Sequence, residues 1–148
     1  MATLVWNVLL VDDSPEYLYI FENAASDLHL PIMVHSVDSA LEAINFLSKQ
    51  GQYLGRPTPD LIISDLNMPK MSGLQLLETL KKSTWKDIPI VIHSTTARPS
   101  EFHAARALGA VEFWTKPGTL EDLMAQIPRV LKFIGHTNVE GSEGFQGA

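Results

Sequence analysis

The sequence predicts an α/β protein of the flavodoxin-like, doubly wound type, with a five-stranded parallel sheet and five helices. Apolar, β-rich runs alternate five times with segments of helical length, which is typical of βαβ units. The apolar runs are nearly continuous, as in strands that are buried on both faces. The 148 residues, 45% of them hydrophobic, are enough for one domain with a substantial core.

The first half of the chain predicts three strands and two helices. The run VWNVLLV reads as the first strand, and Ser14 with Pro15 supplies an N-cap and a first helical residue for the helix that follows. PIMVHS is the second strand, and Ser39 with Glu42 forms a capping box for the second helix. The Gly/Pro-rich loop GQYLGRPTP leads to the third strand, LIIS. The expected apolar faces of the two helices are Leu18, Phe21, Ala25 and Leu28, then Leu41, Ile44, Phe46 and Leu47.

The second half continues the alternation. We expect a helix over 73–82, a strand over 88–94, a helix over 99–108, a strand over 110–114 and a helix from Thr119 to about 134. Thr119 with Asp122 caps the last helix. The Gly-rich, polar residues 135–148 carry no periodicity, so the domain is expected to span 1–134 and a flexible tail to follow.

Composition narrows the classes of function. The net charge of -6 provides no basic surface for nucleic acid, and no run approaches the roughly 18 apolar residues of a membrane span. The absence of cysteine excludes disulfides and thiolate metal sites. The short apolar start has no basic region or cleavage motif, so no signal peptide is expected. We therefore expect a cytoplasmic protein that binds neither nucleic acid nor membrane.

Polar residues follow the predicted strands where ligands of an open parallel sheet bind, at the carboxyl ends. Asp12 and Asp13 follow the first strand, Asp65 ends the third, Ser94 the fourth, and Lys116 follows the fifth. If the first and third strands are neighbours, three carboxylates converge and repel one another unless a cation enters. Such oxygen ligands suit Mg²⁺ beside a phosphoryl group. Asp65 is then the natural nucleophile of aspartyl-phosphate chemistry.

Four motifs carry a family resemblance. VLLVDDSP, LIISDLNMPKMSG, IPIVIHSTTA and GAVEFWTKP resemble, in order and spacing, the receiver domain of two-component response regulators. The match runs from about Leu4 to Ile134. The segment GQYLGRPTPDLIISDLNMP further resembles the single-domain subgroup that works with bacterial phytochromes. The resemblance implies the strand order 2-1-3-4-5.

The resemblance also implies roles for individual residues. Asn67 and Thr96 lie where the family tunes how fast the phosphate is lost. Three positions depart from the family pattern: Phe113 has no hydroxyl, Gly118 replaces a bulky residue, and His93 replaces an aliphatic one. We interpret His93 as a packed core histidine. The implied roles are phosphoacceptor, Asp65; Mg²⁺ ligands, Asp12, Asp13, Asp65 and the backbone carbonyl of Asn67; phosphoryl contacts, Ser94, Thr95 and Lys116; switch residues, Ser94 and Phe113.

By resemblance the protein is a stand-alone response regulator in a phosphorelay. A sensor histidine kinase or phosphotransfer protein would supply the phosphoryl group, and the protein would catalyse only its own phosphorylation and dephosphorylation. Ser94 would move toward the phosphoryl group and vacate space for Phe113. This change would alter the face formed by the fourth helix, fifth strand and fifth helix, with a homodimer as one outcome.

Two other classes of function remain open at this stage. A Mg²⁺-dependent phosphatase would need a second acid near the nucleophile, whereas the residue two positions after Asp65 is Asn67. An interaction module that has lost its chemistry would lack site residues, whereas all are present. Turnover of a generic phosphate ester would favour the phosphatase. Failure to bind Mg²⁺ would favour the interaction module.

Overall fold

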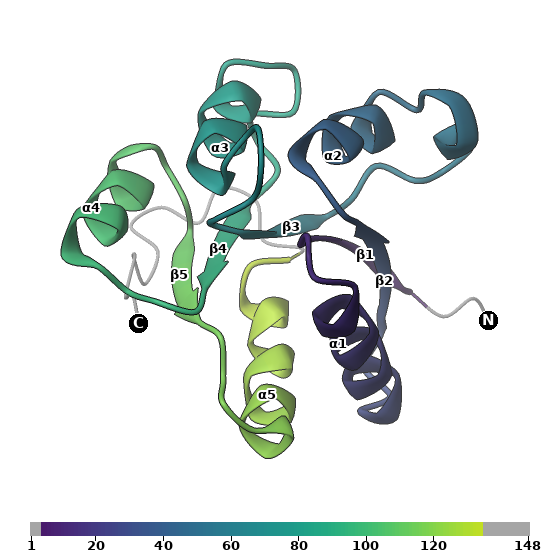
Figure 1. The fold of residues 1–148 in the computed structure, drawn as a ribbon. Coiled ribbons are helices and arrows are strands. Elements are labelled where there is room, and N and C mark those ends of the chain that lie inside the picture. The colour runs from purple at the N-terminus through teal and green to yellow at the C-terminus, as the bar shows by residue number, and fades with distance from the viewer. Residues whose placement is uncertain (1–3, 135–148) are drawn as a thin grey trace.

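A computed structural model describes residues 4–134, which form one parallel sheet with helices on both faces (Figure 1). The strand order is β2-β1-β3-β4-β5, as predicted, and all four pairings are parallel. The strands are β1 (Trp6–Val11), β2 (Ile32–Val37), β3 (Leu61–Asp65), β4 (Ile90–Ser94) and β5 (Glu112–Thr115). Both β3 and β4 are buried along their whole length, which explains their unbroken apolar sequences.

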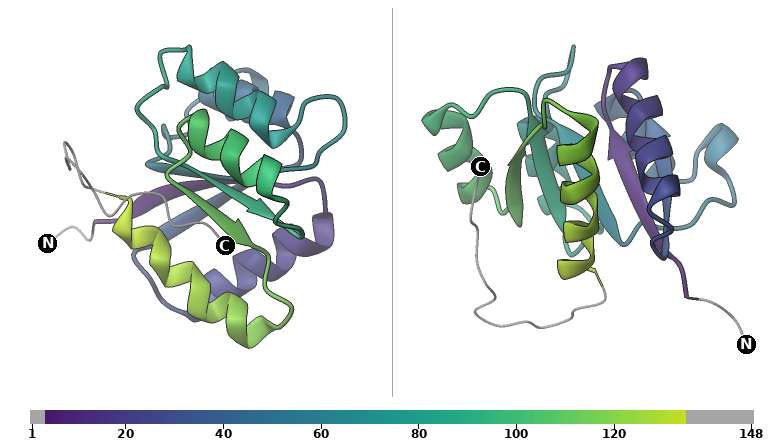
Figure 2. Two further views of the ribbon diagram at one scale, coloured as in Figure 1. Left: turned by 90° about the vertical axis from the view of Figure 1, so that its left-hand side faces the viewer. Right: turned by 90° about the horizontal axis from the view of Figure 1, so that it is seen from below.

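The helices form two layers (Figures 1 and 2). The helices α1 (Pro15–Asp27) and α5 (Leu120–Gln126) cover one face of the sheet, and α2 (Ala40–Leu47), α3 (Gly73–Lys81) and α4 (Pro99–Ala107) cover the other. Two separate apolar clusters correspond to these faces. Short 3₁₀ segments, η1 (Gly51–Tyr53) and η2 (Ile127–Lys132), follow α2 and α5. The helices cover the two faces of the sheet, so a ligand site can form at the edge where the carboxyl ends of the strands lie.

Helix caps agree largely with the sequence. The hydroxyls of Ser14, Ser39 and Thr119 each accept a hydrogen bond from the backbone N–H three residues later. The predicted capping box of Ser39 is only half formed, because the Glu42 carboxylate accepts instead from Tyr53 on η1 at 2.5 Å. A complete box that the sequence analysis missed joins Ser72 and Gln75 at the start of α3.

Two further details differ from the predictions. Leu41, expected on the apolar face of α2, is 63% exposed, since that short helix buries only a narrow stripe. The last helix was expected to run to about 134, but α5 ends at Gln126 and continues as η2. Pro128 explains this change, because it has no N–H to continue the α-helical hydrogen bonds.

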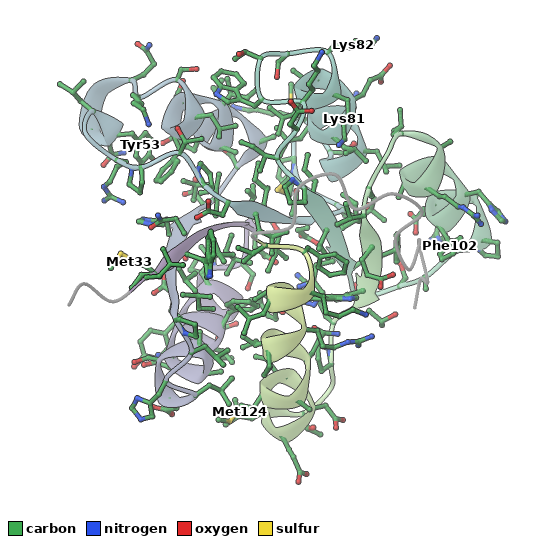
Figure 3. All side chains as sticks on the ribbon, turned by 180° about the vertical axis from the view of Figure 1, so that it is seen from behind. Met33, Tyr53, Lys81, Lys82, Phe102 and Met124 are labelled. Carbon is green, nitrogen blue, oxygen red and sulfur yellow. The ribbon has the colours of Figure 1, made fainter. Side chains whose placement is uncertain are left out.

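Figure 3 places Met33 at the β2 edge, where its side chain is 54% exposed, and Phe102 on α4 at the other side of the molecule.

Within residues 4–134, no helix has the length and apolar character to cross a bilayer. The predicted tail, 135–148, lies outside the described residues, and the domain boundary at 134 stays a prediction.

Candidate phosphoryl and metal site

The sheet brings the predicted acidic residues together at its carboxyl edge. Because β1 pairs with β3, the end of β1 lies beside Asp65. Ligand oxygens of Asp12, Asp13 and Asp65 all lie within 4.8 Å of one another. Lys116, just after β5, reaches across to the same cluster. The predicted site residues at the ends of three strands therefore lie close together, as their positions in the sequence suggest.

Asp12 is the buried anchor of the cluster. Its carboxylate is 1% exposed and accepts from the backbone N–H of Ser14 at 2.9 Å through Oδ1. The other oxygen, Oδ2, accepts from Lys116 Nζ at 2.6 Å. Both oxygens are thus held, so Asp12 links the loop after β1 to the end of β5. Asp13 is exposed, which leaves its carboxylate accessible from solvent.

Asp65 sits in an environment that disfavours its charge. It is 7% exposed, and its Oδ1 accepts from the backbone N–H of Leu66 at 2.9 Å and lies 3.5 Å from Lys116 Nζ. Burial raises the pKa of Asp65 to about 6, helped by the charges of Asp12 and Asp13 and opposed by Lys116. Lys116 therefore lowers the pKa of Asp65 but does not offset the effect of burial.

The backbone of Asp65 is fixed by the start of α3. Gly73 donates its N–H to the carbonyl of Leu66 at 2.8 Å. A Cβ at position 73 would lie 2.1 Å from the carbonyl oxygen of Asp65, so only glycine permits this approach. The sequence contains Gly73 in the recognised motif, but its role in seating α3 against β3 was not predicted.

The end of β4 lies next to Asp65, whose partner in the sheet is His93. Ser94 is fully buried, and its hydroxyl accepts from the backbone N–H of Thr96 at 3.2 Å. Its carbonyl accepts from the N–H of Lys116 at 2.7 Å, which joins β4 to the segment after β5. Thr95 and Thr96 are exposed. Ser94 is therefore held by the backbone of its own loop in this state.

Two other predicted residues occupy less central places. Asn67 is exposed, two residues beyond Asp65. Phe113, the predicted switch residue, is fully buried in β5, with its ring 6.1 Å from that of Phe102 on α4. Phe113 thus already fills an interior position, whereas its movement into the interior was expected to follow a shift of Ser94.

An aromatic contact to the lysine was not predicted. Lys116 Nζ lies 4.4 Å from the centroid of the Tyr17 ring. The Tyr17 hydroxyl in turn hydrogen-bonds to the buried imidazole of His93. A signal was present in the sequence: the Ser14 cap makes Tyr17 the third residue of α1, which the loop after β1 holds beside the carboxyl ends.

The donor set fits a hard divalent cation. Three carboxylates converge, one of them accessible, and among residues 4–134 no thiolate or imidazole belongs to the cluster. The cluster places three carboxylates beside the ammonium of Lys116, which leaves a formal excess of negative charge. A divalent cation would supply the missing positive charge, so the residues present suit Mg²⁺ or a cation of similar preference.

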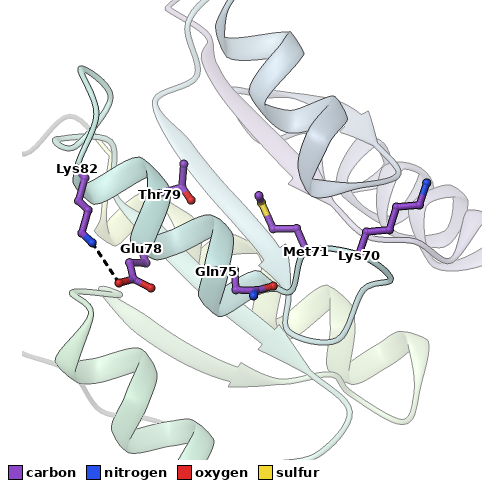
Figure 4. A pocket seen from close by; sticks show the side chains of 6 residues that line it. All are labelled: Lys70, Met71, Gln75, Glu78, Thr79 and Lys82. Atoms are coloured by element: carbon purple, nitrogen blue, oxygen red, sulfur yellow. Dashed lines mark hydrogen bonds and ion pairs between the residues drawn. The ribbon is translucent and has the colours of Figure 1, made fainter.

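A separate hollow of about 420 Å³ lies over α3 and the loop before it (Figure 4). Glu78 and Lys82 form an ion pair of 3.3 Å along its rim. The side chains around it are Lys70, Met71, Gln75, Glu78, Thr79 and Lys82, and none of them belongs to the acidic cluster. This hollow is therefore distinct from the phosphoryl and metal site.

Comparison with known proteins adds independent findings. The family model of the response regulator receiver domain matches residues 8–128. Response regulator Rcp1 of Synechocystis sp. is 29% identical over 127 residues, which cover 85% of this chain and 86% of Rcp1.

Solved structures agree with the sequence match. The phosphorylated cyanobacterial phytochrome response regulator RcpA superposes with a TM-score of 0.78 at 28% identity, covering 88% of this chain and 94% of RcpA. The Mn²⁺-bound form of Rcp1 gives a TM-score of 0.76 at 29% identity, covering 86% and 93% of the two chains.

Proposed function

The chain belongs to the response regulator receiver family of two-component signalling, and from this premise we propose that Asp65 accepts a phosphoryl group in a Mg²⁺-dependent reaction. Receiver domains act with histidine kinases or phosphotransfer proteins. A phosphohistidine on such a partner is the proposed donor. The observation that carries the proposal is the meeting of three carboxylates within 4.8 Å, with Lys116 Nζ 3.5 Å from Asp65.

In the proposed transfer, the residues of this chain supply the nucleophile and the charge stabilisation. A carboxylate oxygen of Asp65 attacks phosphorus, an O–P bond forms, and the P–N bond to the donor imidazole breaks. Lys116 offsets the charge on the phosphoryl oxygens, and the Ser94 hydroxyl is a donor to them. The strand-end positions fix these groups before the donor arrives, so positioning and electrostatics supply the catalysis.

The proposed metal ligands are Asp12, Asp13, Asp65 and the backbone carbonyl of Asn67. Mg²⁺ at this place would neutralise charge shared between carboxylates and phosphoryl oxygens. The Mn²⁺-bound form of Rcp1 supports a divalent cation in a related protein. In this chain the support is the shared cluster and the raised pKa of Asp65, which a bound cation would lower.

Phosphorylation is proposed to act through Ser94 and Phe113. Attraction of the Ser94 hydroxyl to the phosphoryl group would break its present hydrogen bond from Thr96 N–H. The loop leading into α4 would then move, and the face of α4, β5 and α5 would change with it. We propose that this face binds a partner, with a homodimer as one form, and that the protein acts as a stand-alone regulator in the cytoplasm.

The test is phosphorylation by a small donor. Acetyl phosphate with Mg²⁺ should add one phosphoryl group to the protein, measured by intact mass, and chelation by EDTA should prevent it. Asp65→Asn should remain unmodified, whereas Asp60→Asn, a control outside the acidic cluster, should be labelled like the wild type. Equal labelling of the Asp65 variant would refute the assignment.

The switch has its own test. Sedimentation velocity with and without beryllofluoride should show a change in self-association or in binding of an added partner, and Phe113→Ala should diminish it. If neither sedimentation nor hydrogen exchange over 98–118 responds to beryllofluoride, the switch face lies elsewhere.

A further inference from the structure

Tyr17 and His93 form a buried polar pair that has no part in the roles described above. His93 lies on β4, the strand between β3 and the edge strand β5, and is 1% exposed. Burial lowers its pKa to about 3, so the imidazole is neutral. The Tyr17 hydroxyl lies 3.1 Å from Nδ1 and 3.2 Å from Nε2. The pair therefore joins α1 to the strand next to Asp65.

The aromatic ring of Tyr17 faces the ammonium group of Lys116. Lys116 Nζ is 4.4 Å from the ring centroid, a distance at which an ammonium is attracted by the negative face of an aromatic ring. Burial, with the charges of Asp12 and Asp65, raises the pKa of the Tyr17 hydroxyl, so the phenol stays neutral. The contact is shielded from water, since the lysine side chain is only 11% exposed.

Tyr17 is held at its backbone as well as at its hydroxyl. The N-cap hydroxyl of Ser14 accepts from Tyr17 N–H at 3.2 Å, and Ser14 N–H donates to Asp12. The Trp114 ring also packs edge-on against His93, with centroids 6.1 Å apart. The phenol ring is thus fixed at both ends and presents a defined face to the lysine.

Lys116 needs such support, because its side chain has several rotatable bonds. Its Nζ is drawn more closely to Asp12, at 2.6 Å, than to Asp65, at 3.5 Å. Besides these two carboxylates, Nζ contacts the Tyr17 ring. This contact with the Tyr17 ring limits the positions that Nζ can take when the negative charges of the site change during phosphoryl transfer.

We propose that Tyr17, anchored by His93, is a positioning residue that keeps Lys116 directed at the phosphoryl group on Asp65. The inference rests on the proposed function, since it assigns a role within that reaction. The hydroxyl of Tyr17 contributes the anchor and its ring contributes the contact. Both residues act through Lys116 and have no proposed contact with the phosphoryl group.

The first experiment measures the rate of phosphorylation by acetyl phosphate at saturating Mg²⁺. Tyr17→Phe retains the ring and loses the anchor, and we expect it to slow the reaction about threefold; Tyr17→Leu loses both and should slow it about tenfold. Tyr19→Phe, on the same helix at a residue 70% exposed, is the matched control and should match the wild type. A wild-type rate in Tyr17→Leu would overturn the proposal.

A double-variant cycle separates anchoring from general loss of packing. His93→Leu should slow the reaction as much as Tyr17→Phe, and the double variant should be no slower than either single variant. If the two losses multiply, the residues act independently and the anchoring role is wrong.

A second readout needs no phosphoryl donor. In the wild type, the Lys116 ammonium protons should give an NMR signal shifted upfield by the ring current of Tyr17 and protected from exchange. Tyr17→Leu should lose both properties, and an unchanged signal would overturn the inference. If the wild type accepts no phosphoryl group, the proposed function fails, while this measurement still decides whether Tyr17 positions Lys116.

Discussion

Asp65→Asn should stabilise the metal-free protein at neutral pH, although it removes the proposed phosphoacceptor. Asp65 is 7% exposed, lies in a cluster of three carboxylates and, among residues 4–134, pairs with Lys116 as its nearby cation. Its amide analogue can keep the hydrogen bond from Leu66 N–H, made at 2.9 Å. The variant therefore removes an unfavourable buried charge and leaves the local shape unchanged.

The magnitude follows from the pKa of Asp65, which is raised from 3.8 to about 6. A difference of about 2 units corresponds to about 3 kcal/mol at pH above both values. Because the folded-state pKa is the higher one, the proton stabilises the fold. Wild-type stability from this group is fully present below pH 3.8 and is lost as the pH rises through about 6.

Urea unfolding of both proteins in EDTA at several pH values tests this sign. The variant should exceed the wild type by about 1–3 kcal/mol at pH 7.5, and the gap should shrink toward pH 4.5. Asp27→Asn, at the exposed end of α1, is the control and should follow the wild type. Saturating Mg²⁺ should narrow the gap at pH 7.5. A variant that is no more stable than the wild type at pH 7.5, or a gap independent of pH, would refute the reasoning.

Three further outcomes are expected. Titration calorimetry should show that Asp13→Ala weakens Mg²⁺ binding more than Asp12→Ala, because Asp12 is already engaged by Lys116 at 2.6 Å; the reverse order would contradict this ranking. Lys116→Ala should still be phosphorylated but should lack the conformational response, and a wild-type spectral change on phosphorylation would make that lysine a bystander. Gly73→Ala should lower the free energy of unfolding by about 2 kcal/mol or more, because its Cβ would lie 2.1 Å from a carbonyl oxygen of β3. Gly118→Ala is the control and should be neutral, since the space around Gly118 is open. Similar urea midpoints for the two variants would contradict the close contact at Gly73.

Much of the fold could be predicted because the relevant signals are local and repeated. Each buried strand appears as an apolar run, and α1, α2, α3 and α5 begin after a Ser or Thr cap, whereas α4 begins after Arg98, whose side chain makes no cap hydrogen bond. The clustering of Asp12, Asp13, Asp65 and Lys116 followed from one topological rule, that parallel strands deliver their ends to a common edge. That prediction also required the first and third strands to be neighbours, which the structure confirms.

What the sequence did not predict depends on distances between elements. The Tyr17 hydroxyl meets His93 only once α1 packs on the sheet, so the two residues, 76 positions apart, carry no shared pattern. The role of Gly73 depends on how closely α3 approaches β3. Leu41 was misassigned because the helical period sets a direction but does not set how wide a stripe the neighbouring elements cover.

The ion pair between Lys116 and Asp12 has a consequence for how the protein folds. It joins residues 104 positions apart, so it forms only after the chain has closed a very long loop. In chain order β1 and β3 precede β5, and pairing of those two strands alone assembles the carboxylates without their lysine.

An intermediate of that kind would carry a concentrated negative charge at one edge of its sheet. Repulsion within the cluster would then be relieved when β5 docks and delivers the ammonium. The electrostatic arrangement proposed for phosphoryl transfer would thus also favour completion of the sheet, and salt or divalent cations would alter the folding rate most at that final step.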